Sequence, residues 1–213
     1  MHDYEPLVRG WQKTNDVASD AQSLLCLHGC EHTFFHSKRV AHEAARLANV
    51  FGVDPQAAMT AGYLHDISAV YPNQVRIEVA ESLGIEILPE EKAFPMIIHQ
   101  KISKAMARDL FSIKDSAILS AIECHTTLKT NPSRLDLVLF VADKIEWDQT
   151  GTPPYVQQLI PELEKSLERA AHVYLSHLWE QREKLRVVHP WLRDAYLDLS
   201  RGTSYVSEGG ECI

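Results

Sequence analysis

Apolar side chains recur at helical spacing along almost the whole chain, and this periodicity limits the possible folds more than any other feature of the sequence. Between residues 40 and 51, for example, they fall at Val40, Ala44, Leu47, Ala48 and Phe51, which lie on one face of a helix. No segment alternates convincingly between apolar and polar residues as a half-buried strand does. The sequence therefore predicts an all-α fold.

Glycine, proline and capping residues divide this pattern into separate predicted helices. Gly52 ends the first of them, and Asp54-Pro55 is typical of an N-cap followed by proline at the first helical position. Ser133 and Asp136 fit a capping box before an apolar helix. We expect helices over about 74–83, 94–111, 118–125, 137–145 and 155–184, then a short helix from Pro190 and a frayed tail over 200–213.

The composition is that of an ordinary globular protein, with 213 residues of which 45% are hydrophobic and 23% charged. One domain over residues 1–213 is expected. The net charge of −8 argues against broad binding to nucleic acids or anionic membranes, because both need a basic face. No apolar run reaches the ~18–20 residues of a membrane span, and the N-terminus lacks a secretion signal. The four cysteines form no CxxC pair. We expect a cytoplasmic protein with reduced thiols.

Side chains of the types that bind metal ions occur at five places in the predicted helices, namely His36, His65-Asp66, His99, His125 and Asp143. A single inward-facing histidine is more often a hydrogen-bonded core residue than a ligand, so the prediction depends on the ordered set. Asp143 is informative because a carboxylate inside an apolar helical run is rarely buried unless it is paired or metal-bound. Facing helices can direct such residues to one point. Imidazoles and carboxylates without a thiolate suit iron(II), manganese or another first-row divalent ion.

This ordered set resembles the H…HD…D pattern that defines the HD superfamily of metal-dependent phosphohydrolases. Within the superfamily, the chain is most similar to the YqeK-type symmetrical bis(5′-nucleosyl)-tetraphosphatases. The likeness runs from about residue 30 to 147 and is carried by His99 and by the segments 36–40 (HSKRV), 61–66 (AGYLHD), 122–127 (IECHTT) and 141–146 (VADKIE). It implies an all-helical HD bundle with its core at about 30–147 and a C-terminal helical extension at about 153–199.

The resemblance also implies which residues bind metal. A first ion would be held by His36, His65, Asp66 and Asp143. His99 and His125 would either complete a second metal site or contact a phosphate. The expected cofactor is one or two divalent ions, with iron as the first choice and manganese as the alternative.

Asp66 and His125 are the expected catalytic residues. Asp66 would bridge two ions or accept a proton from the attacking water. His99, His125 and Thr126 are expected to contact the substrate, the last two by donating hydrogen bonds to a phosphate. The expected partner is a small nucleotide or phosphate substrate.

Several basic residues of the family pattern are absent here. Ala69 stands where the family has a lysine, Thr33 where it has an arginine, and the segment Trp147-Asp148-Gln149 lacks a further arginine. Lys129 is the candidate replacement for substrate binding, and Lys144 is either another source of positive charge or a solvated surface residue. Because an arginine binds phosphate through two hydrogen bonds at once, these departures affect the predicted substrate and leave the predicted metal ligands unchanged.

The segment after residue 150 carries no motif of its own. The amphipathic stretch 155–184 is expected to pack onto the bundle, with a homodimer interface as the alternative. Trp147 and Tyr155 are expected in the core, although either ring could stack on a nucleobase.

Three functions fit these observations. The first is a metal-dependent phosphohydrolase acting on a nucleotide, in its most specific form the symmetrical cleavage of a dinucleoside tetraphosphate to two nucleoside diphosphates. The second is a regulatory protein that keeps the metal site and binds a nucleotide without turnover. The third is a di-iron oxygenase. The missing basic residues are what keep the second and third functions open.

Overall fold

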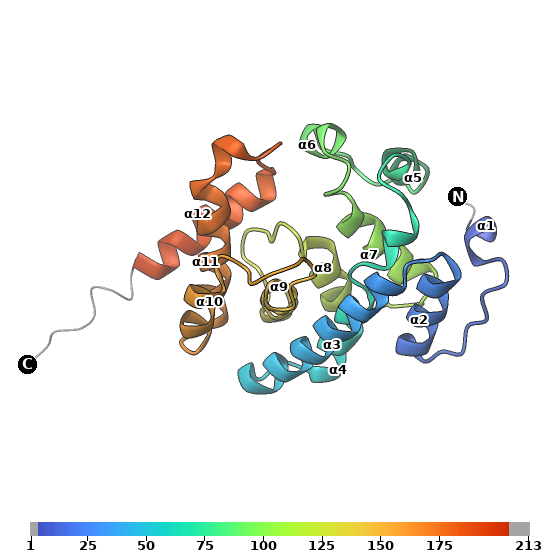
Figure 1. Cartoon of the computed structure of the whole chain (residues 1–213), viewed down its shortest axis with the longest axis horizontal. Coiled ribbons are helices and arrows are strands. Elements are labelled where there is room, and N and C mark those ends of the chain that lie inside the picture. The colour runs from blue at the N-terminus through green and yellow to red at the C-terminus, as the bar shows by residue number, and fades with distance from the viewer. Residues whose placement is uncertain (1–3, 205–213) are drawn as a thin grey trace, which may run out of the picture.

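The computed structural model describes residues 4–204 of the chain, and within this range it contains only helices joined by turns and loops (Figure 1). The all-α prediction is confirmed. The α-helices are α1 (Glu5–Val8), α2 (Val17–Leu27), α3 (Glu31–Phe51), α4 (Pro55–Leu64), α5 (Arg76–Ser82), α6 (Pro89–Ala93), α7 (His99–Asp109), α8 (Ser116–Cys124), α9 (Arg134–Ile145), α10 (Val156–Leu163), α11 (Leu167–Glu180) and α12 (Pro190–Ser204), and the 3-10 helices are η1 (Ile67–Val70) and η2 (Arg182–Lys184).

Helices α3 and α4 form an antiparallel pair whose backbones touch at Gly62. A Cβ atom at this position would lie 2.4 Å from the Cα of Ala41, so only glycine allows the two helices to come this close. Gly52 ends α3 in the left-handed conformation, as predicted, and Asp54 caps the start of α4. The pair brings His36, near the start of α3, beside His65 at the end of α4, with ring centroids 5.3 Å apart.

Helix α9 is the central helix of the fold. The capping box of Ser133 and Asp136 starts it as predicted, and residues 135–142 are all buried. It contacts α3, α4 and α8 on one side and α11 on the other, so that α10–α12 lie together at one end of the molecule (Figure 1). A helix that is buried on all sides needs apolar neighbours on every face. A polar residue on α9, such as Asp143 near its end, is therefore largely removed from water, and 13% of the Asp143 side chain is exposed.

Three predicted helix boundaries are wrong. The helix predicted over 94–111 begins only at His99, because Phe94 precedes Pro95 and adopts a non-helical conformation. The stretch 155–184 is divided into α10, α11 and η2, because Ser166 is extended and caps a new helix with its side chain. The helix from Pro190 is not short, since it continues to Ser204. The predicted tail therefore begins inside α12, and its part from 205 to 213 lies outside the described residues.

A buried ionic cluster joins the C-terminal region to α6 and α7. The carboxylate of Glu91 is fully buried and lies 2.9 Å from Nζ of Lys101 and 3.3 Å from Nε2 of His189. The backbone N–H of Leu88 also donates to it, at 2.8 Å. Burial by itself raises the pKa of Glu91, but the hydrogen bonds from His189, Leu88 and Lys101 outweigh this and hold the pKa below its ordinary value of 4.5.

This cluster makes the protein sensitive to acid. Because the pKa of Glu91 is lower in the folded than in the unfolded chain, its contribution to the free energy of unfolding is complete above about pH 4.5 and is lost as the pH falls further. We expect Glu91→Gln to flatten the fall in stability between about pH 5 and pH 3, measured by urea unfolding. Glu81→Gln, at an exposed position, should keep the wild-type slope. Equal slopes in the two variants would contradict this account.

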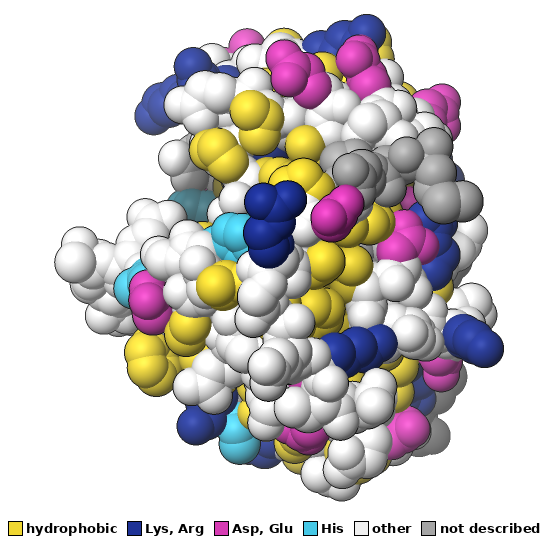
Figure 2. Space-filling model, turned by 90° about the vertical axis from the view of Figure 1, so that its right-hand side faces the viewer, with side chains coloured by type: hydrophobic (Ala, Val, Ile, Leu, Met, Phe, Trp, Pro, Cys, Tyr) yellow, Lys and Arg dark blue, Asp and Glu magenta, His cyan; other side chains and the backbone are white. Residues whose placement is uncertain are grey.

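Charged side chains of both signs are interspersed on the face shown in Figure 2. No helix among the described residues is long and apolar enough to cross a membrane.

Candidate metal centre

Three histidines share one local arrangement in which the ring is fixed by its own backbone. In His65, His99 and His125, Nδ1 lies 2.7, 2.6 and 2.8 Å from the carbonyl oxygen three residues earlier. A carbonyl oxygen can only accept, so Nδ1 carries the hydrogen and the lone pair of the neutral ring is on Nε2. His65 and His125 directly follow α4 and α8, where helix carbonyls lack intrahelical partners. In each ring, Nε2 is therefore the nitrogen left to bind a metal ion or a further proton.

The first group of ligand atoms consists of side chains from α3, from the end of α4 and from α9. Nε2 of His36 lies 3.1 Å from Oδ1 of Asp143. Nε2 of His65 lies 3.6 Å from the same oxygen and 3.5 Å from Oδ2 of Asp66. Four residues that span more than a hundred positions in the sequence thus present ligand atoms to one place.

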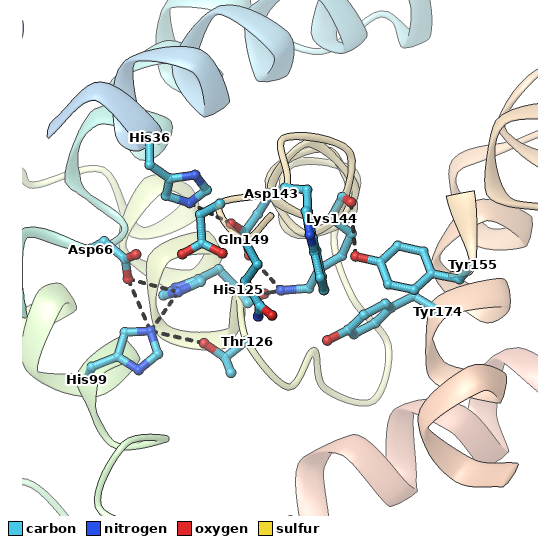
Figure 3. A pocket seen from close by; sticks show the side chains of 12 residues that line it. His36, Asp66, His99, His125, Thr126, Asp143, Lys144, Gln149, Tyr155 and Tyr174 are labelled. Carbon is cyan, nitrogen blue, oxygen red and sulfur yellow. Dashed lines mark hydrogen bonds and ion pairs between the residues drawn. The ribbon is translucent and has the colours of Figure 1, made fainter. Parts of the chain in front are cut away.

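The second group lies on the other side of Asp66. Nε2 of His99 is 3.1 Å and Nε2 of His125 is 3.5 Å from Oδ1 of Asp66. The two Nε2 atoms are only 2.9 Å apart, and the Oγ1 atom of Thr126 lies 3.2 Å from Nε2 of His99. Asp66 therefore directs one carboxylate oxygen to each group, and Figure 3 shows its contacts with His99 and His125.

Burial and charge set the protonation of these side chains. Burial by itself lowers the pKa of His65, but the carboxylates of Asp66 and Asp143 raise it to about 9. Burial lowers the pKa of His125 to about 4, and the neighbouring imidazoles add to this effect against the hydrogen bond to Asp66. Burial by itself raises the pKa values of Asp66 and Asp143. The charges and hydrogen bonds of the neighbouring histidines, together with Lys144 beside Asp143, outweigh this effect and hold both pKa values well below the ordinary range. The two carboxylates are charged and His125 is neutral at pH 7.

The donor set fits divalent metal ions. Nε2 of His65 is buried and has no hydrogen-bond partner, which is costly unless a further group binds there. Nε2 of His99 and Nε2 of His125 lie 2.9 Å apart, a distance that fits two nitrogen ligands of one ion. Two nitrogen ligands at right angles on one ion, each about 2.1 Å away, lie about 3 Å apart. Two sets of three ligand residues, both including Asp66, meet the distance requirement for a metal site.

A pocket of about 180 Å³ opens beside the two groups. Its wall includes ligand residues of both groups and, from other parts of the chain, Lys144, Gln149, Tyr155 and Tyr174 (Figure 3). Nζ of Lys144 lies 2.5 Å from Oδ2 of Asp143, and Asp143 raises the pKa of this lysine although burial opposes it. The lysine therefore pairs with the carboxylate oxygen that faces away from His36, and Oδ1 stays beside the imidazoles of His36 and His65.

The structure brings together most of the residues selected from the sequence. Those that meet at the centre are His36, His65, Asp66, His99, His125, Thr126 and Asp143. Lys129 is elsewhere: its ammonium group pairs with Asp136 at 3.1 Å, and it does not line this pocket. Lys144 is buried and not on the solvated surface. Tyr155 is buried as expected and also lines the pocket.

Sequence reasoning missed Gln149 and Tyr174. Gln149 lies in the segment that was noted only for its missing arginine, and Tyr174 lies outside the motifs. The one available signal for Tyr174 is a polar-tipped aromatic residue on the apolar side of a predicted amphipathic helix.

Comparison with known proteins agrees with this geometry. The family model described as "HD domain" matches residues 33–148, which is more than half of the chain. A Lactococcus lactis subsp. cremoris protein named "Uncharacterized protein in pepC 5'region" is 49% identical over 71% of this chain and 77% of its own length. The "Bis(5'-nucleosyl)-tetraphosphatase, symmetrical" of Halalkalibacterium halodurans is 32% identical over 59% of this chain and 67% of its own length.

A solved structure shares most of the fold. It is described as the crystal structure of a predicted HD superfamily hydrolase involved in NAD metabolism from Clostridium acetobutylicum, and it matches with a TM-score of 0.79 at 25% identity, over 90% of this chain and 99% of that one. A Mycoplasma genitalium protein is 28% identical over 68% of this chain, and this match covers only 42% of that longer protein.

An all-α bundle with a histidine–aspartate metal centre defines a class of metal-binding hydrolases. The chain belongs to the HD domain family.

Proposed function

We propose that the protein is a metal-dependent phosphohydrolase that cleaves dinucleoside tetraphosphates symmetrically into two nucleoside diphosphates. The observation that carries this proposal is the position of Asp66 between two groups of ligand atoms, with one oxygen directed to each. Such an arrangement would hold divalent ions on both sides of Asp66, and bound ions would supply positive charge for phosphoryl oxygens. The similarity to a relative named as a symmetrical bis(5′-nucleosyl)-tetraphosphatase supports the choice of substrate.

The residues of the two groups would hold one ion each. His36, His65, Asp66 and Asp143 are assigned to the first ion, and Asp66, His99 and His125 to the second. We propose iron(II) for both, with manganese able to replace it, because the set has imidazoles and carboxylates but no thiolate. Bound ions of this kind lower the pKa of a coordinated water and neutralise charge on phosphoryl oxygens.

The side chains around the centre then have separate tasks. Asp66 would orient the attacking water and accept its proton. The hydroxyl of Thr126, beside His99, donates to a phosphoryl oxygen. The reaction adds one water across the central P–O–P bridge: the water oxygen bonds to one phosphorus, the bridging oxygen leaves with the other, and both products are nucleoside diphosphates.

The test is anaerobic incubation of the iron- or manganese-loaded protein with diadenosine tetraphosphate, with the products separated by anion exchange. ADP as the sole nucleotide product is expected. AMP together with ATP would contradict symmetrical cleavage. Binding of the substrate without any product would favour the regulatory alternative instead.

A further inference from the structure

Tyr174 reaches the metal pocket from α11, a helix that lies beyond the segment matched by the family model. Its ring is held in place by edge-on contacts with Phe140 and Tyr155, at centroid distances of 5.6 and 4.8 Å. The ammonium group of Lys144 lies 5.1 Å from the same ring. The ring is thus fixed on three sides, and its direction is determined by the packing between α9 and the C-terminal helices.

The two tyrosines in this wall differ in what their hydroxyl groups do. The hydroxyl of Tyr155 donates to the backbone carbonyl oxygen of Lys144 at 3.1 Å, and this bond occupies it. The hydroxyl of Tyr174 has no hydrogen-bond partner among the described residues. Figure 3 shows it directed toward the side of the pocket where Thr126 lies. It is therefore a donor available to a ligand in the pocket.

The pocket has little positive charge of its own to attract an anion. Among the described residues that line it, Lys144 is the only lysine or arginine, and its ammonium group already donates to Asp143 and to the carbonyl oxygen of His125, at 2.5 and 3.3 Å. Asp66, Asp143 and Asp148 add negative charge to the wall. An anionic substrate would therefore depend on bound metal ions for charge and on neutral donors for hydrogen bonds, namely the hydroxyls of Thr126 and Tyr174 and the side-chain amide of Gln149.

The size of the pocket indicates which part of a nucleotide enters it. A volume of about 180 Å³ is below the roughly 300–1,000 Å³ of sites that enclose a whole small-molecule ligand. The space next to the ligand groups suits phosphoryl groups, and a nucleoside would extend outward. A group at the position of Tyr174 thus meets phosphate oxygens and not a base.

We propose that Tyr174 donates a hydrogen bond to a phosphoryl oxygen of the substrate held at the metal centre, so that the C-terminal extension supplies part of the phosphate site. This rests on the proposed function only in taking the ligand to be a phosphate. The phenolic O–H of tyrosine is a hydrogen-bond donor, and a phosphoryl oxygen is an acceptor.

The test compares Tyr174→Phe with the wild type as the full chain loaded with manganese. The substitution removes one hydroxyl and keeps the ring that packs against Phe140. We expect inorganic phosphate, measured by equilibrium dialysis, to bind roughly 10- to 100-fold more weakly, with the bound manganese unchanged. The matched control is Tyr196→Phe, which removes a hydroxyl from a stacked ring outside the pocket and should bind phosphate as the wild type does.

The outcomes separate this proposal from the proposed function. Wild-type affinity for phosphate in Tyr174→Phe, or no phosphate binding by the loaded wild type, would overturn the role of Tyr174. Weaker phosphate binding by this variant, in a protein that does not cleave diadenosine tetraphosphate, would uphold the phosphate contact and reject the proposed substrate. If both are correct, kcat/KM for diadenosine tetraphosphate falls together with the phosphate affinity.

Discussion

Replacement of Asp66 by alanine is expected to lower kcat/KM for diadenosine tetraphosphate by roughly 10³-fold or more. Asp66 contributes one oxygen to each group of ligand atoms, so its loss affects both proposed ions at once, whereas the loss of His36 or His99 would affect one. The amount of bound metal should fall in parallel. Steady-state kinetics and atomic absorption on the same preparations measure the two effects.

Asp194→Ala is the matched control for this prediction. It also removes a carboxylate, but from an exposed pair with Arg193 on α12, and both activity and metal content should remain at the wild-type level. A variant Asp66→Ala that keeps two ions and wild-type turnover would show that the carboxylate is not shared. If it keeps its metal but loses turnover, Asp66 acts on the water and not as a ligand.

Gly62→Ala is expected to reduce the free energy of unfolding by about 3 kcal/mol, the upper part of the range for overpacked sites. The added methyl group would lie 2.4 Å from the Cα and 2.7 Å from the backbone N of Ala41. Neither atom belongs to a flexible side chain, so α3 and α4 must separate. For a chain of this length such a loss corresponds to a fall in Tm of about 6–12 °C, measured by thermal unfolding.

The consequences of this separation extend to the metal centre. The carbonyl oxygen of Gly62 accepts the hydrogen bond that fixes His65, and α3 carries His36. We therefore expect weaker metal binding as well as lower stability in Gly62→Ala. Gln56→Ala, at an exposed position of the same helix, should change neither. An unchanged Tm in Gly62→Ala would mean that the two backbones do not touch in solution.

Features that depend on a few neighbouring residues could be predicted from the sequence. Gly52 ends α3, and the capping box of Ser133 and Asp136 starts α9, because each acts within one helical turn. The break at Ser166 was missed because a serine inside an apolar periodic stretch is ambiguous until its backbone conformation is known. The choice between a capping residue and an exposed one is made by the packing of α10 against α11.

In the site, too, residues within motifs could be predicted from the sequence, whereas residues placed by long-range packing could not. The order of His36, His65-Asp66 and Asp143 suggested a centre, and the structure brings these side chains together. The partners of Lys129 and the position of Tyr174 depend on contacts with α9 and α11. Those contacts join residues far apart in the sequence and leave no local pattern. The residues beyond the motifs could therefore not be assigned before the fold was known.

The proposed ligands of the centre come from five separate segments that begin at His36 and end at Asp143. An unfolded chain cannot hold them together, so an ion binds the native state in preference and shifts the folding equilibrium by mass action. At a free metal concentration 100 times Kd, one such ion adds about 2.7 kcal/mol to the free energy of unfolding. Metal supply would then govern how much of this protein stays folded, independently of whether any substrate is present.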